Sequence, residues 1–177
     1  MLGYTRGGKN MTQEPIVNPE DLDIRISNVV ASASLDQSFD LLAIYKVFKN
    51  VEYRPKEFPG LVFRLKSPKS TTLIFRSGKM VCTGSTSAKM ARRAVHKVVR
   101  ELRKNGIVVL GKPKIEIQNM VASANLHGSI DLEIAADVLD NVMYEPEQFP
   151  AMIYRMPDAR LCTLPRSQLK HCKYNPS

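Results

Sequence analysis

The alternation of apolar and polar residues along positions 24–106 predicts one β-α-β-β-β-β-α unit. Residues 24–33 alternate and are rich in β-branched side chains, which indicates a strand, whereas residues 40–48 carry apolar side chains at helical spacing. Turn signals separate four further strands, at 51–53, 60–66, 71–75 and 79–83. Residues 87–104 predict a long helix capped by Ser87. The expected fold class is therefore α+β, an antiparallel sheet with its helices on one face.

The chain contains this pattern twice. A shift of 91 residues lays IRISNVVASASLDQSFDL over IEIQNMVASANLHGSIDL, and residues 24–65 share 19 identities with residues 115–156 in 42 gapless positions. Two copies are too few for a solenoid, so we expect two fused halves related by a pseudo-twofold axis. Such a protein suits a partner that is itself roughly twofold, either duplex DNA or the symmetric surface of another protein.

One face of the predicted sheet has no element to cover it. If Met80 and Cys82 face the helices, the alternation leaves the opposite face lined by apolar side chains and threonine. An exposed apolar surface of that size needs a partner, and a β-sandwich of two packed sheets is the alternative. The residues expected on the open face are Leu73, Phe75, Lys79, Val81 and Thr83.

The first strands of both halves carry a matched asparagine and valine. Asn28 precedes Val30 by two residues, and Asn119 precedes Val121 in the same way. An amide beside small apolar side chains suits the minor groove at A·T pairs, which offers acceptors and lacks the amino group of guanine. A single asparagine in a strand is usually a satisfied edge or turn residue, but two symmetry-related sites favour base recognition.

Phenylalanines and basic residues complete the candidate nucleic-acid interface. Phe58 and Phe149 lie in matched EFP and QFP turns, and Phe75 supplies a second aromatic position in the first half. An inserted phenylalanine can unstack a base step, although a single one is more often a core residue. The basic candidates for phosphate contact are Arg64, Lys79 and Arg155, for each of which a solvated surface charge is the alternative.

The net charge of +9 and a pI near 9.6 favour a polyanionic partner. Its distribution is uneven, because residues 24–106 carry 17 Lys and Arg against 5 Asp and Glu, a net charge of +12, whereas residues 115–156 carry a net charge of −6. The two halves are therefore expected to present different surfaces to their partners.

Several function classes are disfavoured by the sequence. Apolar runs are too short for a membrane span, the first residues lack a secretory core, and three cysteines do not suggest a disulfide scaffold. The histidines have no evident catalytic partners, and the chain has no Gly-rich phosphate loop, so we predict a non-enzyme without a cofactor. Cys162, His171 and Cys172 are a poor signal for a metal site.

The paired segments NVVASASL and NMVASANL, with EYRPKEFPGLVFRLKSPKSTTLIFRSGKMVCTG and MYEPEQFPAMIYRM, resemble the signatures of TATA-box-binding proteins. The resemblance covers residues 24–156 and implies a saddle of two repeats, whose curved antiparallel sheet lies on a widened minor groove with helices on the convex side. It implies that the two asparagines bond central bases, that Phe58, Phe75 and Phe149 kink the DNA, and that Arg64, Lys79 and Arg155 lie near its backbone. The residues implied to pack on base edges are Val30, Leu73, Val81, Thr83 and Val121.

The resemblance also implies partners and a compartment. Tyr144, Glu145 and Glu147 resemble the loop that receives transcription factor B, through which RNA polymerase is recruited to promoter DNA. The polar leader and YEPEQFP are closer to archaeal members, for which a cytoplasmic, nucleoid-associated location is expected, than to nuclear eukaryotic ones. We expect no membrane partner, and we expect exposed strand edges to favour self-association.

The second half departs from the repeat after Met156. Phe75 maps by the 91-residue shift to Arg166, and no SGK-x-V-x-TG segment follows. We therefore expect a second repeat that lacks two strands and a helix and is less stable than the first, owing to a natural variant or a sequencing frameshift. The alternative function is a truncated paralogue acting as a regulatory or protein-interaction module without stable DNA binding.

The expected organisation is a disordered leader at 1–23, repeats at 24–106 and 115–158, a linker at 107–114 and an irregular tail at 159–177.

Overall fold

The computed structural model describes residues 23–126, 130–155, 161–165 and 169–174. The first half contains β1 (Asp23–Ser34), α1 (Leu41–Val47), β2 (Val51–Tyr53), β3 (Gly60–Lys66), β4 (Lys69–Phe75), β5 (Lys79–Ser85) and α2 (Ala88–Lys104). The second half contains β6 (Lys114–Asn125), α3 (Leu132–Val138), β7 (Val142–Met143), β8 (Ala151–Tyr154), β9 (Leu161–Pro165) and β10 (Leu169–Tyr174). Residues 1–22 of the predicted leader lie outside the described residues, and residue 23, which the prediction placed in the leader, begins β1.

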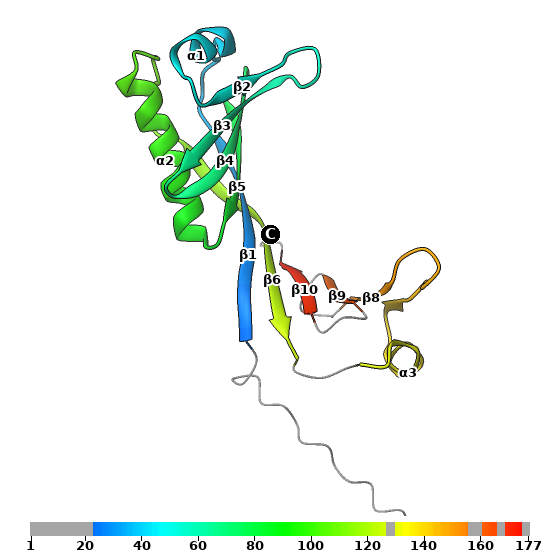
Figure 1. Cartoon of the computed structure of the whole chain (residues 1–177). Helices are drawn as coiled ribbons and strands as arrows, with labels where there is room; N and C mark the ends of the chain where they lie inside the picture. Colours follow the sequence, from blue (N-terminus) through cyan, green and yellow to red (C-terminus); the bar gives the residue numbers. More distant parts are fainter. Residues whose placement is uncertain (1–22, 127–129, 156–160, 166–168, 175–177) are drawn as a thin grey trace, which may run out of the picture.

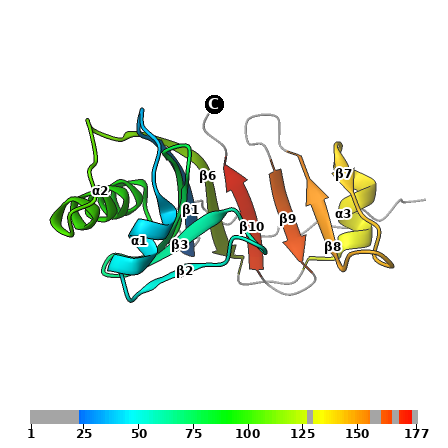
Figure 2. The ribbon, with the colours of Figure 1, turned by 90° about the horizontal axis from the view of Figure 1, so that it is seen from above.

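The ten strands of the described residues form one antiparallel sheet in the order β2-β3-β4-β5-β1-β6-β10-β9-β8-β7. The first strands of the two halves, β1 and β6, pair with each other at the centre, so the sheet continues from one half into the other (Figures 1 and 2). Helices α1 and α2 lie on the first half and α3 on the second (Figure 2). The predicted α+β class and the doubled unit are confirmed, and a β-sandwich is excluded for the described residues.

Local sequence explains where the helices begin. The Ser87 hydroxyl accepts a hydrogen bond from the Met90 amide at 3.2 Å, as predicted for the cap of α2. Asp40 and Asp131 occupy equivalent positions before α1 and α3, and each carboxylate accepts from two amides of the first turn. The duplicated sequence therefore encodes the same helix start twice.

Two β-bulges in the central strands reverse the side of the sheet to which the side chains at the strand ends point. The pairing of β1 with β6 shifts between Ile26 and Asn28, and again between Val30 and Ala31 opposite Gln118. A bulge adds one residue to one strand and so reverses the alternation beyond it. Ile115 and Ile117 consequently pack against the core of the first half, on the same side as the helices. Strict alternation from Ile24, as the sequence suggested, does not account for this arrangement.

The expectation that the second half lacks two strands is wrong. Residues 161–165 and 169–174 form β9 and β10, which fill the sheet between β8 and β6. Without β9 and β10, the facing edges of β8 and β6 would expose unpaired backbone N–H and C=O groups. A segment in extended conformation, such as LCTLP, can form hydrogen bonds with these groups. The tail is therefore not irregular over these residues. Among the described residues, however, no helix follows β10 to match α2.

The hydrophobic core is concentrated in the first half. Its centre includes Phe63, Ile74, Val95 and Leu102, each at most 1 % exposed. In the same core the Cys82 thiol is fully buried, and burial raises its pKa, so the neutral thiol is favoured. The second cluster among the described side chains has only Leu132 and Met152 as buried members. No described helix is long and apolar enough to cross a membrane.

This uneven core predicts uneven stability. Amides of α2 and β5 are expected to exchange with solvent only on global unfolding. Amides of α3, whose one buried residue is Leu132, should exchange through local opening that requires less free energy. Native-state hydrogen exchange measured by mass spectrometry checks this. Equal protection of α2 and α3 would show that the second half is as firmly held as the first.

Candidate nucleic-acid interface

The face of the sheet opposite the helices carries a row of apolar side chains across the first half. Val62, Leu73 and Val81 are cross-strand partners on β3, β4 and β5, and Val81 pairs in turn with Ser32 on β1. All four are half-buried, whereas their sequence neighbours Leu61, Ile74, Met80 and Cys82 face the helices and are buried. The row therefore belongs to an open surface, hereafter the open face, as the alternation predicted.

The matched asparagines and valines meet at the centre of this face. In the pairing of β1 with β6, Asn28 lies opposite Val121 and Val30 lies opposite Asn119. The four residues thus form a group with the pseudo-twofold symmetry expected from the repeat. All four are half-buried. The structure thus pairs two matched segments whose equivalent residues are 91 positions apart in the sequence.

The amide of Asn28 is held in one orientation. Its Oδ1 accepts hydrogen bonds from the Gly84 backbone N–H at 2.8 Å and from the Thr83 hydroxyl at 3.1 Å. Because a backbone N–H can only donate, the carbonyl side of the amide must face Gly84. Both Nδ2 hydrogens remain for an acceptor outside the sheet. Asn119 makes no matching contact within the described part of the chain.

Two predicted wedge residues form an aromatic pair at the outer end of the first half. The rings of Phe58, between β2 and β3, and Phe75, at the end of β4, lie with centroids 5.8 Å apart and planes inclined by 65°. Gly60 makes this packing feasible, because a β-carbon there would lie 2.6 Å from the Phe58 ring. A hollow of about 230 Å³ borders the Phe58 ring and is lined by Glu52, Arg54, Glu57, Phe58, Gly60 and Val62.

At the other end of the sheet, no ring of the described residues forms a pair with Phe149. Phe149 is 48 % exposed, and Ala151, the counterpart of Gly60, pairs with Pro165. Since Gly60 pairs with Phe75, the register places Pro165 at the position of the missing phenylalanine. The mapping of Phe75 to Arg166 is therefore wrong by one residue, because the pairing of β8 with β9 is shifted by one relative to β3 with β4. The same shift places Thr163 and His171 at the positions of Leu73 and Val81.

The predicted phosphate contacts are exposed but differ in their surroundings. The Arg64 guanidinium lies against Glu52, with Nε 3.2 Å from one carboxylate oxygen, and both side chains are more than half exposed. Lys79 and Arg155 are exposed and form no ion pair with any described residue. An exposed pair such as that of Arg64 contributes about 0–1 kcal/mol, so a phosphate can compete with Glu52.

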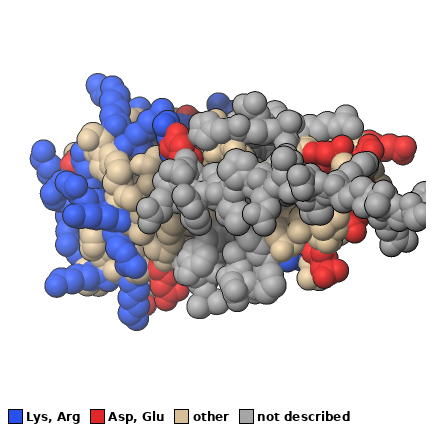
Figure 3. All heavy atoms as spheres, turned by 90° about the horizontal axis from the view of Figure 1, so that it is seen from below, with Lys and Arg blue, Asp and Glu red and all other residues tan. Residues whose placement is uncertain are grey.

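Surface charge separates the two halves as the sequence predicted. Lys and Arg side chains gather over the first half and Asp and Glu over the described part of the second (Figure 3). The loop between β7 and β8 contributes Glu145 and Glu147, both exposed, beside the half-buried Tyr144. The Phe149 amide donates to the Glu145 carbonyl at 2.9 Å, as the Phe58 amide does to Arg54, so the two loops share a turn.

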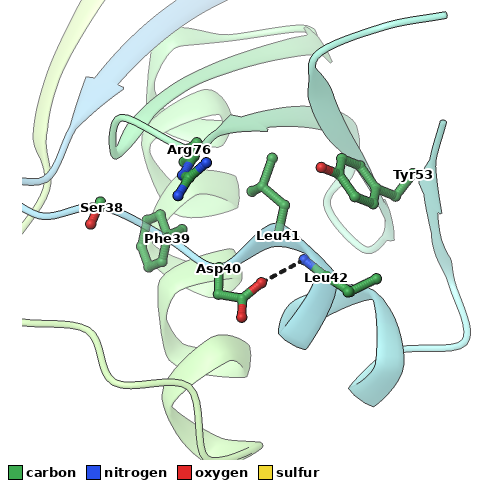
Figure 4. Close-up of a pocket in the computed structure, with 7 residues that line it drawn as sticks. All are labelled: Ser38, Phe39, Asp40, Leu41, Leu42, Tyr53 and Arg76. Atoms are coloured by element: carbon green, nitrogen blue, oxygen red, sulfur yellow. Dashed lines mark hydrogen bonds between the residues drawn. The ribbon is translucent and has the colours of Figure 1, made fainter. Parts of the chain in front are cut away.

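A further hollow, beside helix α1, does not belong to the open face. Its volume is about 360 Å³, and its lining residues are Ser38, Phe39, Asp40, Leu41, Leu42, Tyr53 and Arg76 (Figure 4). The Asp40 carboxylate accepts from the Leu42 amide at 2.9 Å and from the Ala43 amide at 3.1 Å. The acidic group of this hollow is therefore committed to capping the helix.

Sequence reasoning missed some members of the open face. Val62 and Ser32 belong to the apolar row, and Thr71 lies beside it as the cross-strand partner of Thr83. Val62 lies two residues before Arg64, so the alternation used for β4 and β5 could have found it. The pairing of Arg64 with Glu52 had no comparable signal, because it depends on the register of β2 with β3.

Known proteins match the chain in sequence and in structure. A sequence profile described as "Transcription factor TFIID (or TATA-binding protein, TBP)" matches residues 23–105 and 114–167. The TATA-box-binding protein of Sulfolobus acidocaldarius is 54% identical over 141 residues, 80% of this chain and 72% of the relative. That of Sulfurisphaera tokodaii is 51% identical over 154 residues, 87% and 77% of the two chains. The structure of Methanococcus jannaschii TBP matches with a TM-score of 0.76 at 41% identity, covering 87% of this chain and 89% of the other.

Proposed function

Because the chain belongs to the TATA-box-binding protein family, we propose that it is a non-enzymatic transcription initiation factor whose open face binds the minor groove of A·T-rich promoter DNA. The orientation of Asn28 carries this proposal. With Oδ1 committed to Gly84 and Thr83, the side chain offers only donors to a ligand. In the minor groove, A·T pairs present only the acceptors A N3 and T O2, whereas G·C pairs add a donor.

The apolar row complements this polar contact. Val62, Leu73 and Val81 offer a surface that releases water when it packs against the sugar and base edges of a widened groove. The guanine amino group would be buried there without an acceptor, which costs about 1–3 kcal/mol. The same surface therefore supports both affinity and the preference for A·T pairs.

The Phe58 and Phe75 pair supports bending of the bound DNA. Apolar side chains inserted at a base step partly unstack the base pairs and kink the duplex. We expect two neighbouring rings to unstack the step further than a single ring does. Phe149 has no described aromatic partner at the opposite end. We therefore infer an asymmetric bend, stronger at the end of the site that contacts the first half.

The acidic loop of the second half is proposed to receive transcription factor B, through which RNA polymerase would be recruited. Glu145 and Glu147 are exposed next to Tyr144, a combination that suits a basic protein surface with an apolar contact. The charge reversal Glu145→Lys should abolish joint assembly of the two proteins on promoter DNA while leaving binding to DNA alone unchanged. Gel electrophoresis of the ternary complex measures both.

The proposed function is tested by equilibrium binding of the full chain to a fluorescent TATA duplex and to the same duplex with G·C substitutions. We expect tighter binding to TATA, with a steep loss of affinity at rising salt because phosphates are neutralised. A regulatory or protein-interaction module without stable DNA binding is the second candidate, favoured by the absence of an aromatic partner for Phe149 among the described residues. That function predicts no stable complex with either duplex.

Removal of the Glu52 carboxylate is expected to strengthen DNA binding. Glu52→Gln takes one negative charge away from the Arg64 guanidinium and from the approaching phosphates. We expect a gain of about 0.5–1 kcal/mol, or roughly two- to fivefold in affinity, that shrinks at high salt. Glu57→Gln, which frees Arg54 in the neighbouring turn, is the matched control for a general charge effect. Equal gains in DNA affinity from the two variants would show that Arg64 has no specific role.

A further inference from the structure

The outward side of helix α2 carries a row of basic residues. The buried side chains of the helix, from Ala91 to Leu102, pack in the core of the first half. On the opposite side, basic residues follow one another at intervals of three or four, which places them on one face. This row is called the basic strip, and its members are Lys89, Arg93, Lys97, Arg100 and Lys104. With a helical rise of about 1.5 Å per residue, the strip is about 22 Å long.

The described part of the fold does not neutralise the charges of the basic strip. All members except Lys97 are exposed, and none of the five forms an ion pair with a described residue. Arg92 and Arg103, the other arginines of α2, donate instead to the backbone carbonyls of residues 115 and 109, at 2.9 Å and 3.2 Å. These two arginines therefore have structural roles, whereas the charges of the strip remain open to a ligand.

A hollow lies between the basic strip and the turn that joins β3 to β4. Its volume is about 340 Å³, and its lining residues are Ser67, Pro68, Arg93, His96, Lys97 and Arg100. Lys97 Nζ donates to the Ser67 carbonyl at 2.6 Å, which fixes the ammonium group and leaves two of its three donors for a ligand. Lys66 and Lys69 flank the turn and are exposed. The hollow therefore offers N–H donors and positive charge, with no carboxylate among its described lining residues.

These features suit a nucleic-acid backbone better than an acidic protein. Protein interfaces take much of their affinity from apolar and aromatic side chains, whereas interfaces with DNA are more polar and much more positively charged. Of the described α2 side chains, Met90 is the one large apolar residue that is exposed, at 36 %. Each strand of duplex DNA carries one phosphate per about 3.4 Å of the helix axis, so a strip of about 22 Å spans about six phosphates.

We propose that the basic strip and its hollow bind the phosphate backbone of a second DNA duplex, whatever the base sequence of that duplex. Helix α2 lies on the side of the sheet opposite the open face, so the two sites can be occupied together (Figure 2). Contacts to phosphates carry no sequence information, so the strip should accept G·C-rich DNA. The chain thus bridges two DNA segments. Binding at the strip is independent of the proposed function, whereas bridging rests on it.

Binding at the strip is tested by anisotropy titration of a short fluorescent G·C duplex with the full chain at several salt concentrations. The double variant Arg93→Gln, Arg100→Gln neutralises two phosphates fewer. Its plot of log affinity against log salt should be less steep by about 1.8, and its affinity at low salt should fall at least about fivefold. Lys46→Gln with Lys49→Gln is the matched control, because it removes the same charge from exposed positions of the first half outside the strip. The control should leave the slope unchanged.

Bridging is tested by adding the G·C duplex to the chain already saturated with a TATA duplex that carries a second dye. Gel electrophoresis of the parent should show a complex that contains both dyes. The double variant should retain the TATA duplex and lose the G·C duplex. A chain that binds the G·C duplex through the strip but shows no preference for TATA would contradict the proposed function and support the strip.

Three outcomes would overturn the proposal. The first is an equal slope for the parent and the double variant, with thermal unfolding showing that both are folded, or an equal change of slope in the matched control. The second is that the TATA and G·C duplexes exclude each other, which would place both on the open face. The third is tighter binding of a Glu-rich peptide than of a G·C duplex of the same charge, which would identify an acidic protein as the ligand.

Discussion

Loss of the paired rings at Phe58 and Phe75 is expected to remove most of the DNA bend at the end of the site bound by the first half. The double variant Phe58→Ala, Phe75→Ala deletes both apolar wedges, so the base step they enter can restack. The apolar contact of both rings with the DNA is lost as well, and we expect an affinity loss of about 2–4 kcal/mol for the double variant. Energy transfer between dyes at the ends of a TATA duplex measures the bend.

Phe149→Ala supplies the comparison for this result. Its ring has no described aromatic partner, so its removal should change the bend less than the double variant does. Thermal unfolding of all variants checks that a loss of bending does not reflect a loss of fold. A larger effect of Phe149→Ala than of the double variant would contradict the inferred asymmetry.

Replacement of Asn28 is expected to reduce both affinity and selectivity for A·T pairs. Asn28→Ala removes the only donor that the side chain presents to the groove, and a base contact of this kind is worth about 1–3 kcal/mol, or roughly 5- to 150-fold. Discrimination between TATA and G·C-substituted duplexes should fall together with affinity. Anisotropy titrations with the two duplexes give both quantities.

Asn28→Asp separates the donor from the structural role of the residue. The carboxylate can still accept from the Gly84 amide and the Thr83 hydroxyl, so the fold should be as stable as in the parent chain. The Nδ2 donor is gone, and a negative charge faces the DNA. We expect a greater loss of binding than with Asn28→Ala. Unchanged binding of the Asp variant would place Asn28 outside the DNA interface.

The order of strands and helices in the first half could be predicted because its signals are local. The alternation in β4 and β5, the Ser87 cap and the repeat spacing each depend on residues that are close in the sequence or duplicated. The bulges at Ser27 and Gln118 could not be predicted, since they arise where β1 pairs with β6, whose partner residues are 80 to 102 positions apart in the sequence. Strands β9 and β10 were missed because their sequence departs from the repeat, while the open edges of β6 and β8 still select extended backbone.

The candidate site shows the same division. The types and spacing of Asn28, Val30 and their counterparts indicate the minor groove from the sequence alone. The amide orientation of Asn28 required the position of Gly84, which only the pairing of β1 with β5 provides. Similarly, the close contact of Phe58 with Phe75 follows from the pairing of Gly60 with Phe75. The sequence indicates which side chains take part, and the register decides how they are held.

Base analogues that alter only one groove test most directly whether the open face recognises the minor groove. Inosine·C pairs match G·C in the major groove except that they lack the minor-groove amino group, so their minor groove resembles that of A·T. Binding of the full chain is compared for a TATA box, its G·C substitution and its inosine·C substitution. We predict that the inosine·C duplex regains most of the affinity lost with G·C, at about 1–3 kcal/mol per substituted pair. Binding of the inosine·C duplex as weak as that of the G·C duplex would contradict minor-groove recognition by the open face.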